Sequence, residues 1–128
     1  MIYDTNFLVA IQGRKKGFSR ADALAWMKRE DSGGAYVPSI VAIEFLGGFA
    51  SDAEGAAHLH YFTILPMDAA VLKEAVEVMR ELRITGQSVG AADSIIAATA
   101  RLYGLPLVTD NIRHFKNVTR LIVRGFMK

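Results

Sequence analysis

The chain has 128 residues, of which 52% are hydrophobic and 22% are charged, and its net charge at pH 7 is only +2. A chain of this size can bury a core, so we predict a single domain over residues 1–128. The lack of cysteine excludes a disulfide framework and thiolate zinc sites, and it suits a reducing cytoplasm. No apolar stretch is long enough for a signal peptide or a membrane span, and the charge is too small for nucleic-acid binding by net charge alone.

Short apolar runs alternate with helical patterns along the chain. The predicted strands are residues 2–3, 35–37, 62–65, 107–109 and 120–123. The predicted helices follow Thr5 and Asn6, then run from Ser19 to Gly33, Pro38 to Gly47, Ser51 to about His60, Asp68 to Gly86, and about Ala91 to Tyr103. Strands separated by helices predict an α/β fold, with a short, mostly parallel central sheet of four to five strands flanked by helices.

Four acidic residues lie where apolar strands or helices begin, end or are interrupted: Asp4, Glu44, Asp93 and Asp110. A carboxylate among apolar groups costs free energy unless it is paired, hydrogen-bonded or bound to a cation. Sites in parallel sheets lie beyond the carboxyl ends of the strands, and the pattern places all four acids near that edge. We therefore expect one cleft that binds a hard metal ion, because such ions take oxygen ligands.

The helix around Asp93 carries the most specific local signal. Asp93 lies in the first helical turn, where the helix dipole favours negative charge, and Ala97 and Ala100 let the helix approach the sheet closely. A lone aspartate there would more often only stabilise the helix, but the other three acids favour a site. We also expect Glu44 to face the cleft while Ile43 and Phe45 pack on either side.

Four segments together resemble the PIN-domain ribonucleases and, within them, the VapC toxins of bacterial toxin–antitoxin pairs. The segments are residues 1–6, 39–45, 93–100, and 107–111 followed by His114 and Phe115. The resemblance implies a PIN-like fold and a metal-dependent endoribonuclease of the cytoplasm. It also implies an RNA substrate, a cognate antitoxin protein and a homodimer, but no membrane contact.

The resemblance also assigns the site residues. Asp4 and Asp93 correspond to the metal-binding acids, Glu44 to the third acid, and Thr109 to a hydroxyl that orients them. Many relatives place a fourth polar residue two positions after this threonine, which is Asn111 here, whereas Asp110 follows the threonine directly. Either Asp110 or Asn111 could face the metal.

The chemistry of phosphodiester hydrolysis agrees with this assignment. One or two Mg²⁺ ions, or Mn²⁺ in their place, can activate water, neutralise the phosphoryl oxygens and assist the leaving oxygen. We assign Asp4 and Asp93 to metal coordination, Glu44 to coordination or to orienting the attacking water, and Asp110 to a supporting or second-metal role. Asn6 could hydrogen-bond the acids, although helix capping accounts for it adequately.

Two other classes of protein are the alternatives. A phosphoacceptor receiver domain would need an adjacent acidic pair after its first strand and a lysine after a late strand, and the chain has neither. A catalytically inactive PIN-like module that binds RNA or protein stays open. The basic turn could guide RNA phosphates or be an ordinary solvated turn; its residues are Arg14, Lys15 and Lys16. We expect Trp26 to pack in the core rather than to line an antitoxin groove.

Overall fold

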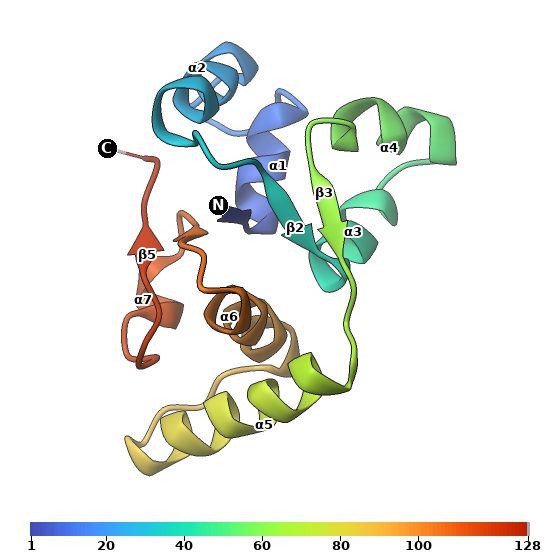
Figure 1. Ribbon diagram of the computed structural model, residues 1–128. Coiled ribbons are helices and arrows are strands. Elements are labelled where there is room, and N and C mark those ends of the chain that lie inside the picture. Colours follow the sequence, from blue (N-terminus) through green and yellow to red (C-terminus); the bar gives the residue numbers. More distant parts are fainter. Residues whose placement is uncertain (128) are drawn as a thin grey trace.

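The computed structural model describes residues 1–127 and has an α/β architecture (Figure 1). The strands are β1 (Ile2–Tyr3), β2 (Tyr36–Pro38), β3 (Thr63–Leu65), β4 (Leu107–Val108) and β5 (Val123–Arg124). The helices are α1 (Thr5–Ile11), α2 (Arg20–Glu30), α3 (Ser39–Leu46), α4 (Asp52–Leu59), α5 (Ala69–Ile84), α6 (Ala91–Tyr103) and α7 (Ile112–Phe115). The predicted alternation of strands and helices is therefore confirmed.

The strands form one sheet in the order β3-β2-β1-β4-β5, and every neighbouring pair is parallel. In the central strand, Ile2 lies opposite both Tyr36 of β2 and Leu107 of β4. Figure 1 shows α1 and α2 on one side of the sheet and the paired helices α5 and α6 on the other. Because the strands are parallel, the chain leaves β1 and β4 at the same edge, where it reaches Asp4 and Thr109.

The predicted boundaries are wrong near the carboxyl end of the chain. The last strand begins at Val123 rather than at Arg120, because Arg120 has a φ of +55° that an extended strand does not allow. Strand β4 ends at Val108, one residue earlier than predicted. Helix α7 was not predicted, since four residues are too few to display a helical period.

The core lies on both faces of the short sheet. Tyr3, Phe7 and Trp26 are buried together, with the ring centroids of Tyr3 and Phe7 4.6 Å apart. Ala97 and Ala100 of α6 are almost completely buried, which confirms the predicted close approach of this helix. Among residues 1–127, no helix is long and apolar enough to cross a membrane.

Capping residues fix several helix ends. Ser19 and Asp22 form a reciprocal capping box at the start of α2, where a helix was predicted to begin. The side chain of Asp68 accepts a hydrogen bond from the Val71 amide and caps α5. Gly104 ends α6 with a φ of +66°, a conformation that glycine adopts without strain.

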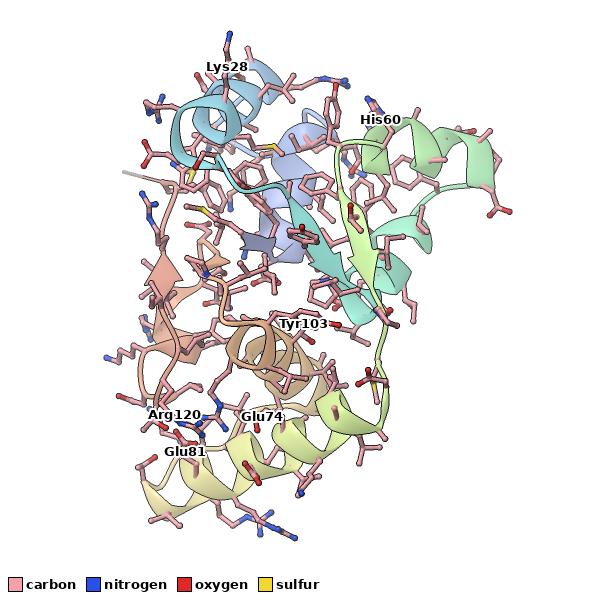
Figure 2. The ribbon with its side chains drawn as sticks, viewed as in Figure 1. Lys28, His60, Glu74, Glu81, Tyr103 and Arg120 are labelled. Carbon is pink, nitrogen blue, oxygen red and sulfur yellow. The ribbon has the colours of Figure 1, made fainter. Side chains whose placement is uncertain are left out.

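A buried arginine ties α5, α6 and the segment before β5 together. The Arg101 side chain, which is only 2% exposed, donates hydrogen bonds to Glu74 at 2.8 Å and to Glu81 at 2.9 Å. It also donates to the carbonyl oxygen of Thr119 at 3.1 Å. Figure 2 shows both glutamates on the side of α5 that faces α6. These contacts hold the α5–α6 pair against the carboxyl-terminal part of the fold.

Candidate active site

Asp4 is the most enclosed acid at the carboxyl edge of the sheet. It is the N-cap of α1, where its Oδ1 accepts a hydrogen bond from the Thr5 amide at 2.8 Å. Its Oδ2 accepts hydrogen bonds from the Thr109 hydroxyl at 2.8 Å and from the Asn6 amide at 3.3 Å. Burial raises the pKa of Asp4, and the charge of Asp93 raises it further, although the hydrogen bonds oppose both effects.

Asn6 and Thr109 fix the orientation of the Asp4 carboxylate. The Asn6 Oδ1 atom accepts a hydrogen bond from the Asp110 amide at 3.1 Å, so its Nδ2 group faces Thr109 and Asp4. The Thr109 hydroxyl accepts hydrogen bonds from Asn6 and from the Asn111 amide, which directs its own proton to Asp4. Helix capping, which the sequence favoured for Asn6, is therefore wrong: Asp4 caps α1, and Asn6 holds Asp4.

Glu44 of α3 and Asp93 of α6 lie within electrostatic reach of Asp4. Although Glu44 is largely exposed, its pKa is raised, first by burial of part of the side chain and then by the negative charges of Asp4 and Asp93. The charge of Asp93 also raises the pKa of Asp4, so these three of the four predicted acids act on one another. Phe45 packs into the core as predicted, but Ile43 is 66% exposed, so the prediction for Ile43 is wrong.

Asp110 does not join the three acids. Its carboxylate forms an ion pair with Lys15, which belongs to the loop between α1 and α2. Asp110 contributes its backbone amide to the group instead, through the hydrogen bond to Asn6. The role of the Asp110 side chain in catalysis stays a prediction, as does that of Asn111.

His114 is a site residue that the pattern of acidic residues did not predict. Its Nδ1 atom lies 2.9 Å from Asp93 Oδ2 and 2.8 Å from the Asn111 side-chain nitrogen. The backbone amide of Asn111 donates a hydrogen bond to the Thr109 hydroxyl, and its side chain contacts His114, so Asn111 also borders the site. The spacing of Asn111 and His114 could have predicted their contact, because residues three apart in a helical turn lie on the same face.

The three carboxylates suit a hard dication that keeps water molecules as its other ligands. Among residues 1–127, no three histidine, aspartate or glutamate side chains converge closely enough to bind an ion by themselves. Mg²⁺ usually keeps several of its waters and takes only one or two protein carboxylates, so full convergence is not required. The pKa values of Asp4 and Glu44 are raised mainly by burial and partly by neighbouring carboxylates, and a bound cation would offset both effects.

Partial burial of Glu44 and its repulsion by Asp4 and Asp93 predict that its neutralisation stabilises the metal-free protein. Glu44→Gln should raise the melting temperature in EDTA at pH 7, whereas Glu77→Gln, on the exposed side of α5, should leave it unchanged. A carboxyl group with a raised folded pKa binds protons more tightly in the folded state, so its destabilising effect appears as pH rises through that pKa. The difference between Glu44→Gln and wild type should therefore shrink when melts are repeated near the ordinary pKa of glutamate, about 4.3.

Glu44 is the better residue for this test than Asp4. An asparagine at position 4 would lose the hydrogen bond that Thr109 donates to the carboxylate, and that loss would mask the relief of repulsion. A lower melting temperature for Glu44→Gln in EDTA at pH 7 would mean that Glu44 makes a stabilising contact and would contradict the grouping of the three acids.

Comparison with known proteins places this arrangement in a family. The family model for the PIN domain matches residues 1–121. A ribonuclease VapC of Rickettsia bellii is 29% identical, over 96% of this chain and 93% of that protein. Ribonuclease VapC10 of Mycobacterium tuberculosis is 31% identical, over 70% of each chain.

Solved structures agree with the sequence comparison. The toxin–antitoxin complex VapBC2 of Rickettsia felis, solved bound to a DNA fragment from its promoter, contains a chain that aligns with a TM-score of 0.76. The two chains are 26% identical, and the alignment covers 98% of each. The sequence match over residues 1–121, the parallel five-stranded sheet and the acids at its carboxyl edge lead to one conclusion: the chain belongs to the PIN domain family and groups with its VapC members.

Proposed function

We propose that the protein is a metal-dependent endoribonuclease that acts as the toxin of a toxin–antitoxin pair. The observation that carries this proposal is the group of acids at the carboxyl edge of the sheet, where Asn6 and Thr109 orient Asp4 and the charges of Asp4 and Asp93 act on Glu44. The names of the VapC relatives, which are ribonucleases, support the reaction class. The VapBC2 complex of Rickettsia felis among the similar structures supports an antitoxin partner.

Asp4 and Asp93 would hold Mg²⁺ or Mn²⁺, and the ion would neutralise the phosphate and lower the pKa of a bound water. Thr109 and Asn6 keep the Oδ2 atom of Asp4 in a fixed orientation. Glu44 has a raised pKa and accepts no hydrogen bond from Thr109 or Asn6, so it is the better placed acid to take a proton from the attacking water. His114 holds Asp93 from the other side.

The antitoxin partner is supported by the same relatives, whereas the homodimer is a proposal that rests on the family resemblance alone. A cognate antitoxin would bind the toxin tightly and suppress its activity, and two toxin chains would associate as a homodimer. Size-exclusion chromatography with light scattering, with and without a co-expressed antitoxin, measures both associations. A toxin that stays monomeric at all concentrations tested would contradict the homodimer but not the enzymatic proposal.

Cleavage of single-stranded RNA tests the enzymatic proposal. The purified protein should cleave RNA in millimolar Mg²⁺ or Mn²⁺ and lose the activity in excess EDTA. Glu44→Gln should lower the rate by at least about tenfold, which corresponds to roughly 1.4 kcal/mol of barrier, while Glu77→Gln should not. If the wild-type protein binds RNA but never cleaves it, the alternative of an inactive PIN-like binding module replaces the enzyme.

Thermal melts in Mg²⁺ test the metal site independently of activity. A ligand that binds only the folded state stabilises it, so saturating Mg²⁺ should raise the melting temperature of the wild type. The increase should be smaller in Asp93→Asn, which removes one carboxylate from the proposed site, than in Asp110→Asn, whose carboxylate pairs with Lys15. Equal increases in both variants would place the ion elsewhere on the protein.

A further inference from the structure

A pocket opens beside the three acids. It is lined by residues 87–90 of the loop between α5 and α6, by Asp93, and by Arg113 and His114 of α7, and its volume is about 250 Å³. We call it the loop pocket. Because Asp93 and His114 also belong to the candidate active site, an RNA strand bound at the acids would pass the mouth of this pocket.

The walls of the loop pocket are fixed by the fold. The loop begins with a hydrogen bond from the Gln87 amide to the Leu82 carbonyl at 2.9 Å. It ends where the Ser94 hydroxyl donates to the Gly90 carbonyl at 3.0 Å. Val89 packs against the hydrophobic core between these two anchors. The opposite wall is also anchored, since Phe115 buries α7 in the core.

The chemistry of the walls fits a nucleobase. Gln87 and Ser88 supply neutral hydrogen-bonding groups, Val89 supplies apolar surface, and Arg113 supplies a planar guanidinium group. Single-stranded RNA is read by proteins that stack its bases on aromatic or arginine planes and hydrogen-bond their edges. A volume of about 250 Å³ is below the roughly 300–1,000 Å³ of sites for drug-sized ligands, which suits a single base.

Most of the pocket wall favours a base over a second phosphate, because residues 87–90 carry no charge. The proposed metal ion at Asp93 would already hold the phosphate of the cleaved bond. The flat guanidinium of Arg113 can stack on a neutral base. We propose that the loop pocket binds the base of a nucleotide next to the cleaved bond and thereby gives the enzyme a sequence preference. This inference rests on the proposed endoribonuclease function.

Mapping cleavage sites on a pool of random single-stranded RNA tests the proposal. Arg113→Ala, Arg113→Lys and Gln87→Ala should each weaken the base preference at one position beside the cleaved bond and slow cleavage at the preferred sites by about tenfold. Arg80→Ala removes the same charge from the exposed side of α5 and serves as the matched control, so it should keep the wild-type preference.

The lysine variant separates base stacking from phosphate binding. Lysine keeps the positive charge but lacks the planar group, so a base pocket should lose its preference in Arg113→Lys as well as in Arg113→Ala. If Arg113→Lys behaves like the wild type while Arg113→Ala weakens cleavage equally at all sequences, Arg113 contacts a phosphate and the proposal is wrong. Wild-type preferences in all three variants would also overturn it.

A binding experiment tests the loop pocket independently of catalysis. Short RNA oligonucleotides with one abasic position are titrated against Asp4→Asn, a non-cleaving background, and against the same background carrying Arg113→Ala. Loss of one particular base should weaken binding by about tenfold in the first protein and much less in the second. If the wild-type protein cleaves no RNA, the proposed function is wrong. If removal of the base weakens binding equally in both variants, the proposal for the loop pocket is wrong.

Discussion

Asp93→Asn should reduce metal-dependent RNA cleavage by at least about a hundredfold, because even the residues that only orient metal ligands contribute 10–100-fold in many enzymes. The asparagine keeps the size of the side chain and removes its charge. Asp93 lies in the first turn of α6, and its charge raises the pKa of both Asp4 and Glu44. The substitution therefore removes one of the three negative charges of the site. Initial rates on a fluorescent RNA substrate in saturating Mg²⁺ measure the effect.

Asp110→Asn is the matched control for this prediction. The substitution is chemically the same, but the Asp110 carboxylate is paired with Lys15 and only its backbone amide supports the site. We expect its cleavage rate to stay within about tenfold of the wild type, the lower end of the range for residues that only orient metal ligands. A loss as large as that of Asp93→Asn would assign Asp110 to the metal site, which the sequence also allowed.

Arg101→Met should destabilise the protein by about 2–4 kcal/mol. The substitution leaves Glu74 and Glu81 without their cation, and it removes the hydrogen bond to the Thr119 carbonyl. The expected cost lies at the lower end for a broken buried pair because the glutamate side chains are 17% and 22% exposed and can reach water. In a chain of this length the melting temperature should fall by roughly 10 °C.

Two further variants test the origin of this effect. Arg80→Met removes an exposed arginine from α5, the helix that carries both glutamates, and should change stability by no more than about 0.5 kcal/mol. Combining Arg101→Met with Glu74→Gln and Glu81→Gln should recover part of the loss, because the stranded carboxylates are then neutral. If the triple variant is no more stable than Arg101→Met, lost packing rather than unpaired charge explains the effect.

The sequence of strands and helices was predictable because each element depends on residues that are close together in the chain. Apolar runs of a few residues gave the strands, and Ser19, Asp68 and Gly104 marked helix ends through contacts within four residues. Asp4 and Asp93 were also found locally, since each directly follows a strand or begins a helix. Alternating strands and helices predict a parallel sheet, so the edge that carries the acids was predictable as well, whereas the pairing of β1 with β4 was not.

The orientation of the side chains at that edge required the tertiary structure. Asn6 contacts Thr109 across 103 positions of sequence, and Lys15 draws Asp110 away from the other acids across 95. His114 reaches Asp93 only because α7, a helix too short to show a period, packs beside α6. A side chain that follows a strand end can point in several directions, and its direction is set by partners that are distant in sequence. The residue types and their order thus determined which acids could meet, and the packing of distant loops decided which of them do.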